Sequence, residues 1–359
     1  MSENEITKSK IIAFNLIFFK NSRVKNRLFI NKISINDFFN LDDFNLQRLG
    51  VREEEYLSMK KYKEIAEKEL ELAKKNDIDL IYIDDKKYPE LLKHIFNPPL
   101  YLYKLGELND LNQMNISVVG TRRPDRYGRY VTTKFIEELI YYGFTIVSGM
   151  AIGIDSLSHE LAIKNKALTI GVNPAGLLYL YPKSKRNVFK NLIKNGAIIS
   201  EFPLSIEPKT FLFPIRNRII SGLSKVLLVM RASKRSGTLI TARHSIEQGR
   251  DVYAVPGNID DKLSEGCNYL ISQGAKPLID IKDVLLDYGI EYEKKPETDL
   301  HLTEKEVKIL NLIEINENKS LDYFVESIDF DVSEILSIMM NLMLKGIIIQ
   351  DSGGYRRIR

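Results

Sequence analysis

Two short segments of this chain contain the residues best suited to bind a phosphate group. The first is Phe213–Gly222, which contains the triplet Arg216, Asn217 and Arg218. Arginine carries a fixed charge and five donors, so it is rarely buried without an anionic partner. In an extended segment, a spacing of two residues would place both arginines on one face. We therefore expect them to face a common anion.

The second segment is Arg235–Thr241, in which Ser236, Gly237 and Thr238 follow one another. Its composition is typical of a loop that enters a helix. Small residues and hydroxyl groups at that position leave backbone N–H groups open to an anion. Because the two segments lie close together in the sequence, they predict one phosphate-bearing ligand.

The distribution of charge indicates that this ligand is a polymer. Residues 116–250 contain 21 Lys and Arg against 8 Asp and Glu, a net charge of +13, whereas the rest of the chain has a net charge of −9. A basic middle between acidic flanks favours a polyanion over a small anion. The alternative is a solvated basic surface with no ligand, but many of these charges fall at predicted loops beside glycines.

Arg122 lies in a third candidate loop, Gly120–Pro124, which follows an apolar segment. A dinucleotide fingerprint would occupy this place, but the G-x-G-x-x-G spacing is absent, which argues against NAD. Arg122 is suited to bind phosphate through two parallel hydrogen bonds. Its alternative role is an ion pair with a carboxylate such as Glu201, and we favour phosphate.

Ser148 and Gly149 open a further turn, Ser148–Asp155, whose backbone N–H groups we expect at the sheet edge. Asp155 falls in the first turn of the next helix, where capping explains it better than acid or base catalysis. His159 is a lone histidine, and we expect it to be structural. The sequence contains no cluster with metal-ligand spacing, so we predict neither a catalytic residue nor a metal or other cofactor.

Three positive charges, Lys183, Lys185 and Arg186, open a helix, where they oppose its dipole. This placement indicates a ligand most clearly for Lys183, whereas the other two fit a solvated turn equally well. The aromatic residues near these loops offer surfaces on which a base could stack. We expect at most one of them to do so, because aromatic side chains at strand ends usually belong to the core; they are Phe202, Phe211 and Phe213.

Short apolar segments alternate with helical ones from Ile116 to Val255, a pattern that predicts a parallel sheet covered on both faces. Right-handed crossovers then place every strand-to-helix loop at one edge, so that the candidate loops meet. The flanks read differently, and we predict four parts: a helical domain at 1–76, the α/β domain at 77–290, a linker at 291–300, and a winged helix of three helices and a hairpin at 301–359.

Composition narrows the class of protein further. A single cysteine, Cys267, excludes a disulfide framework and fits a reducing compartment. No apolar stretch reaches the roughly 18 residues of a membrane span, and the N-terminus does not resemble a secretory signal. We therefore expect a cytoplasmic protein with no membrane partner.

The motifs in their order resemble those of the DNA-processing protein A (DprA/Smf) family: VGTRRP, SGMAIGID, YP, SEFP, FPIRNRIISGLS, RSGTLITA, VPGNID and GCNYLI. The resemblance implies an extended Rossmann-like core with a sterile-alpha-motif-like N-terminal domain and a C-terminal winged helix. It implies a homodimer that binds single-stranded DNA, protects incoming DNA in natural transformation and loads the RecA recombinase. The family's DNA-contacting positions correspond here to Arg122, Ser148, Gly149, Lys183, Arg216, Asn217, Arg218, Ser236, Gly237 and Thr238.

Two positions depart from the family pattern. Ile152 stands where the family usually has an arginine, and Arg231 lies near a position that is usually acidic, so Arg231 could supply the missing phosphate contact.

The same Rossmann variety resembles nucleotide phosphoribohydrolases of the lysine-decarboxylase-like class, but Arg243 or a neighbour stands where those enzymes need a glutamate. A third alternative is a regulator acting through the winged helix, whose recognition helix carries only Lys345 as a positive charge. We expect a binding protein rather than an enzyme.

Overall fold

The computed structural model describes residues 3–293, 302–314, 317–351 and 354–357. The chain divides into two compact units, Met1–Tyr292 and Glu293–Arg359. Most of the predicted linker at 291–300 lies outside the described residues. Within the described ranges, no helix is both long enough and apolar enough to cross a lipid bilayer.

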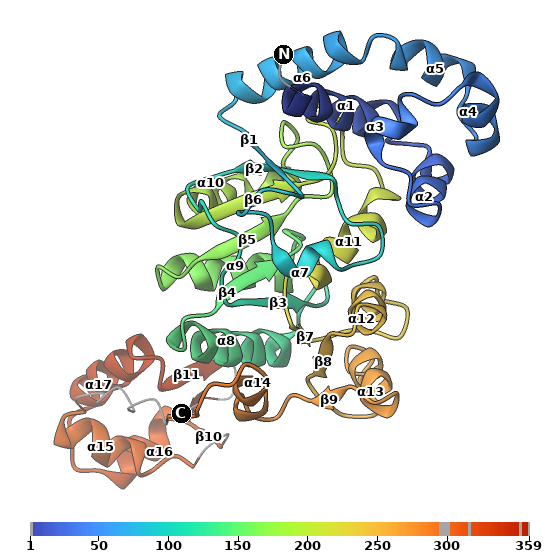
Figure 1. Cartoon of the computed structure of the whole chain (residues 1–359). Helices are drawn as coiled ribbons and strands as arrows, with labels where there is room; N and C mark the ends of the chain where they lie inside the picture. The colour runs from blue at the N-terminus through green and yellow to red at the C-terminus, as the bar shows by residue number, and fades with distance from the viewer. Residues whose placement is uncertain (1–2, 294–301, 315–316, 352–353, 358–359) are drawn as a thin grey trace. The chain divides into compact units, whose positions relative to one another are not determined.

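The first unit is built on a sheet in which nine strands are described, in the spatial order β1-β2-β6-β5-β4-β3-β7-β8-β9 (Figure 1). The strands from β3 to β9 pair in parallel, as predicted, whereas β1 and β2 pair antiparallel at one edge. Their bounds are β1 Asp79–Tyr82, β2 Tyr101–Leu105, β3 Asn115–Val119, β4 Thr145–Ser148, β5 Thr169–Val172, β6 Gly196–Ser200, β7 Val226–Val229, β8 Asp251–Ala254 and β9 Lys276–Pro277.

Helices cover both faces of the sheet and explain why the central strands are apolar on both sides. Ile116 and Val118 pack with α8 and α9 on one face, whereas Val119 packs with α11, α12 and α13 on the other. The helical bounds are α7 Glu90–Lys93, α8 Arg126–Tyr141, α9 Ile154–Lys164, η1 Lys183–Lys185, α10 Arg186–Asn195, α11 Leu212–Gly222, α12 Thr238–Glu247, α13 Glu265–Ser272 and α14 Lys282–Asp287.

The N-terminal part of this unit is helical, as predicted. It comprises α1 Glu3–Ile17, α2 Ser22–Ile30, α3 Ile35–Phe38, α4 Asp43–Leu49, α5 Glu53–Met59 and α6 Tyr62–Lys75. Gly50 ends α4 at a φ of 94°, a left-handed conformation that glycine adopts readily at the end of a helix. Phe14, Phe18 and Phe38 form its aromatic core. Ile12 packs in one cluster with Tyr101 of the sheet, so these helices rest directly on the α/β part.

The second unit contains α15 Glu304–Leu310, α16 Leu321–Ser327 and α17 Val332–Leu344. An antiparallel sheet of order β10-β12-β11 completes the described part, with bounds β10 Asn318–Lys319, β11 Ile348–Asp351 and β12 Gly354–Arg357. Ile309, Phe324 and Ile335 lie in its core. The three helices and the hairpin of β11 and β12 occur in the predicted order, and β10 is an additional strand that the sequence pattern did not predict. The names winged helix and sterile-alpha-motif-like domain stay predictions.

The topology creates a switch point, which is the place at the sheet edge, between β3 and β7, where the order of the strands reverses. The chain builds β3, β4, β5 and β6 toward one side, then crosses back through α11 and continues with β7 on the other side of β3. The loops that leave β3 and β7 therefore run in opposite directions and part at the carboxyl ends of these strands. Open α/β sheets bind their ligands in such a crevice.

Candidate functional site

A cavity of about 410 Å³ lies at this switch point. All ten residues predicted as contacts lie within the described ranges. Arg122, Arg216, Asn217 and the Ser236–Thr238 segment line the cavity, whereas Ser148, Gly149, Lys183 and Arg218 are not among its lining residues. Thr121 and Thr241 also line the cavity, and neither was predicted from the sequence. Thr241 lies three residues after Thr238, on the same face of α12, and this spacing could have revealed it.

Arg216 lies in α11, one of the helices that alternate with the strands as predicted, so it does not lie in the extended segment considered for it. Residues two apart in a helix point about 200° away from each other, so Arg216 and Arg218 do not share a face. The Arg216 side chain is 3% exposed, and its guanidinium donates to the carbonyl oxygens of Gly149 and Val172. Its Nε atom has no partner among the described residues. Burial lowers the pKa of Arg216 to about 10, so it remains a cation at neutral pH.

Ser148 and Gly149 stand behind Arg216 and position it. The Ser148 hydroxyl is buried and donates to the carbonyl oxygen of Val118 at 2.6 Å. The carbonyl of Gly149 accepts from Arg216, and the turn continues through Gly153, whose φ is 93°. A Cβ atom at Gly153 would lie 2.4 Å from the carbonyl oxygen of Thr121, so this glycine lets two loops approach closely.

Asp155 is the acidic residue among those that line the cavity in the described structure. Asp155 lies in the first turn of α9, and its Oδ2 atom accepts from the backbone N–H of Ala151, which precedes the helix, at 3.3 Å. Burial raises the pKa of Asp155 to about 6, against the opposing effect of the neighbouring Arg216 cation. His159 is buried one turn later with its Nδ1 2.7 Å from Thr169 Oγ1, and burial lowers its pKa to about 3.

Arg122 is exposed at the mouth of the cavity. Its guanidinium carbon lies 5.4 Å from the ring centre of Phe213, and that of Arg216 lies 6.0 Å from the same centre. Tyr181 packs edge-on against the Phe213 ring. The alternative partner for Arg122 does not apply, because Glu201 forms its ion pair with Arg218. The exposed Arg122 thus has its guanidinium over an aromatic ring.

The Ser236–Thr238 segment also lines the cavity and leads into α12. Ser236 Oγ accepts from the backbone N–H of Thr238 at 3.2 Å, which fixes the start of the helix. A Cβ atom at Gly237 would meet nothing within 4 Å, so the backbone here is open to a ligand. The N-terminus of α12 therefore adds a partial positive charge to the cavity.

Three basic residues that were considered as phosphate contacts are not among the residues that line the switch-point cavity. Lys183 is exposed on η1, and Arg218 faces a second cavity on the other side of α11. Arg231 is almost fully buried and forms ion pairs with Asp125 and Asp261. The suggestion that Arg231 replaces a missing phosphate contact is therefore wrong, since carboxylates occupy its guanidinium.

These features define a Rossmann-like α/β protein whose ligand cavity at the switch point is cationic. The model of the family described as DNA recombination-mediator protein A matches residues 79–289. Among curated relatives, DNA processing protein DprA of Bacillus subtilis is 40% identical over 228 residues, covering 63% of this chain and 74% of the relative. Protein Smf of Escherichia coli is 37% identical over 289 residues, covering 78% and 77%. The chain belongs to the DNA recombination-mediator protein A family.

Solved structures agree with this assignment. DNA processing protein A from Streptococcus pneumoniae has a TM-score of 0.66 and 32% identity, with coverage of 82% of this chain and 99% of that one. The protein from Helicobacter pylori, whose structure describes its single-stranded DNA binding mode, has a TM-score of 0.53 and 28% identity, with coverage of 58% and 95%. The predicted family and its Rossmann-like core are thus confirmed.

Proposed function

We propose that this protein binds single-stranded DNA through its sugar–phosphate backbone in the switch-point cavity. The observation that carries the proposal is the convergence of Arg122, Arg216 and the N-terminus of α12 on one cavity at the carboxyl edge of the sheet. Membership of the family supports it, as does the relative from H. pylori with its described single-stranded DNA binding mode.

The residues that line the cavity would have different roles in binding the strand. Arg216 is held by two carbonyl groups and supplies a fixed positive charge, whereas the exposed Arg122 can turn toward a phosphate. The hydroxyl groups of Thr121 and Thr241 and the open backbone at Gly237 offer further donors. Phe213 lies beside both arginines and is the aromatic residue best placed to stack on a base. Lys183, outside the cavity, would contact the strand farther along.

A salt titration tests this proposal. Released counterions drive backbone binding, so affinity for an oligothymidylate should fall steeply as salt rises. A mixed-sequence single strand should bind comparably, whereas the matched duplex should bind more weakly because its bases are stacked out of reach. A salt-independent affinity, or equal affinity for the duplex, would contradict the proposal.

We further propose that the chain acts as a recombination mediator in the cytoplasm, as a homodimer that protects incoming single strands and loads a RecA-type recombinase onto them. The support is family membership alone. A loading assay tests the role: the protein should accelerate RecA-dependent ATP hydrolysis on DNA already covered by single-strand-binding protein. Equal rates with and without the protein would contradict it, and sedimentation would test the dimer.

We propose that no chemical step accompanies binding. Arg243, which stands where a phosphoribohydrolase needs an acid, points to solvent and pairs with Glu247. The acid at the cavity, Asp155, is buried beside Arg216. Incubation with nucleoside monophosphates should release no free base, and release of base above the rate of an Asp155→Asn variant would contradict this view.

A further inference from the structure

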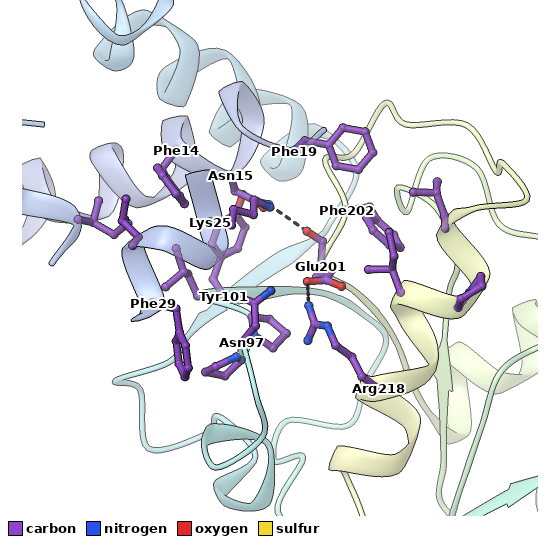
Figure 2. Close-up of a pocket in the computed structure, with 18 of the residues that line it drawn as sticks. Phe14, Asn15, Phe19, Lys25, Phe29, Asn97, Tyr101, Glu201, Phe202 and Arg218 are labelled. Carbon is purple, nitrogen blue, oxygen red and sulfur yellow. Dashed lines mark hydrogen bonds and ion pairs between the residues drawn. The ribbon is translucent and has the colours of Figure 1, made fainter. Parts of the chain in front are cut away.

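A second cavity, of about 570 Å³, lies between the N-terminal helices and α11 (Figure 2). Leu212, Ile215 and Arg218 of α11 line it, whereas Phe213, Arg216 and Asn217 of the same helix line the switch-point cavity. The two cavities therefore lie on opposite faces of α11. Phenylalanine rings form much of the wall of the second cavity: Phe14, Phe19, Phe29, Phe202 and Phe211.

Three charged residues also line this largely aromatic cavity: Lys25, Glu201 and Arg218. Glu201 and Arg218 form an ion pair in which each side chain is 12% exposed. Lys25 lies beside them and donates to Asn15 Oδ1 at 3.2 Å, and burial lowers the pKa of Lys25 to about 8. Glu201 Oε1 and Arg218 Nη1 have no hydrogen-bond partner in the described part of the chain. One acceptor and one donor are thus left unsatisfied at the edge of an aromatic cavity.

This combination restricts the chemistry of a ligand. An aliphatic chain would fill the apolar space but leave both polar atoms unpaired, which is unfavourable. A simple anion would suit Lys25 and Arg218 but would meet the Glu201 carboxylate. A nucleobase has flat faces that stack on phenylalanine and an edge that carries donors and acceptors side by side. The phenylalanine wall matches the flat faces, and Glu201 Oε1 and Arg218 Nη1, both buried, would pair with the base edge once the ion pair turns toward the cavity.

We propose that the second cavity is a base-binding pocket, which receives one nucleobase of the strand whose backbone lies in the switch-point cavity. This inference rests on the proposed function. The strand would pass over the N-terminus of α11, where Lys209 and Phe211 are exposed. Only the width of that helix, about 10 Å, separates the two cavities. The exposed side chain of Lys209 would receive the intervening phosphate.

Photocrosslinking with the full-length protein tests this inference. An oligothymidylate substituted with 5-iodouracil is bound, irradiated and digested, and adducts are located by mass spectrometry. Adducts are expected at Phe213 or Tyr181 from the switch-point cavity, and at Phe29 or Phe202 from the second cavity. Adducts at the first pair alone would overturn the base-binding pocket and leave the proposed function intact. No bound strand at all would overturn both.

A matched pair of variants tests entry into the second cavity. Ile215 lines it and is 42% exposed, whereas Val332, 47% exposed, lines neither cavity, and both lie in the first turn of a helix. An acid in a first turn is favourable for the helix, so both substitutions should fold. Ile215→Glu should remove at least 80% of the Phe29 and Phe202 adducts (roughly a fivefold loss of affinity) and keep those at Phe213. Val332→Glu should keep both sets, and equal behaviour of the two variants would overturn the inference.

Free 5-iodo-deoxyuridine monophosphate distinguishes the source of the base. Labelling of Phe202 should be much weaker with the free nucleotide than with the strand at equal concentration of the base, because the strand is held at its other site. Equal labelling would assign the cavity to free nucleotides and overturn its role in strand binding.

Discussion

The guanidinium of Arg216 occupies the space that a side chain at position 149 would need. A Cβ atom at Gly149 would lie 2.8 Å from Arg216 Nη1 and 2.7 Å from Asp155 Oδ2. The carbonyl of Gly149 also accepts from Arg216, so the same residue makes room for the cation and fixes it. The charge at the floor of the cavity therefore depends on the absence of a side chain on the neighbouring loop.

Replacing Gly149 with alanine should displace Arg216. The new methyl group meets the guanidinium and the Asp155 carboxylate, so we expect a loss of about 1–3 kcal/mol in the free energy of unfolding. Affinity for single-stranded DNA should fall as well, because the cation moves. Urea unfolding and a binding titration measure the two effects.

Gly237→Ala is the matched control for stability. Position 237 has a helical φ of −58° and open space around it, so alanine there should leave stability unchanged within about 0.5 kcal/mol. If the two alanine variants unfolded at the same urea concentration, the close packing of Gly149 against Arg216 would be refuted.

Asp155 should make DNA binding depend on pH. Its pKa is raised to about 6 by burial, so the carboxylate gains a proton as the pH falls through 6. The cavity then loses one negative charge, and affinity for the anionic strand should rise a few-fold between pH 7 and pH 5. The histidine beside it does not contribute, since the pKa of His159 is lowered to about 3.

An Asp155→Asn variant separates this effect from other titrations. It should bind at pH 7 about as tightly as the wild type binds at pH 5, with little further gain on acidification. The sign of the stability effect follows from the same shift: because the folded pKa lies above the ordinary value of 3.8, wild-type stability falls as the pH rises from about 4 to about 6. A variant with the wild-type pH dependence would exclude Asp155 as its origin.

The sequence predicted the α/β core well because its signals are local. Strands such as Val226–Val229 are short, apolar and buried on both faces, and turn residues bound them, so periodicity locates them without knowledge of their neighbours. The antiparallel strands β1 and β2 were harder to predict. Their direction depends on pairing with β6, a long-range contact that the pattern along the chain does not encode.

The site was predicted in its residue types but not in its geometry. Arg122 and Ser236–Thr238 lie on the connections that follow β3 and β7, so topology alone brings them to one edge. The roles of Arg216 and Arg218 depend on the rotation of α11, which points one into the cavity and the other toward Glu201. The two carbonyl groups that hold Arg216 belong to the turn at Gly149 and to the end of β5, and a sequence does not reveal such backbone partners for a buried arginine.

Arg231 should contribute to stability and not to DNA binding. It pairs with Asp125 and Asp261, and each of these carboxylates is about a third exposed. Replacing Arg231 with methionine leaves both acids without their cation, and we expect a loss of about 2 kcal/mol, less than the 3–5 kcal/mol of a fully buried pair. Thermal or urea unfolding measures this loss.

The salt dependence of DNA binding by the same Arg231→Met protein, measured well below its unfolding transition, should match that of the wild type. A shallower salt dependence would show that Arg231 neutralises a phosphate after all.

The most direct test of the central claim is the salt dependence of oligothymidylate affinity for Arg122→Ala. Arg122 lines the cavity and Arg123, its exposed neighbour, does not, so Arg123→Ala is the control. Loss of one phosphate contact should reduce the slope of log affinity against log salt by about 0.7 and weaken binding roughly tenfold. The control should keep the wild-type slope. An Arg122→Ala variant with unchanged slope and affinity would contradict the claim that the switch-point cavity holds the DNA backbone.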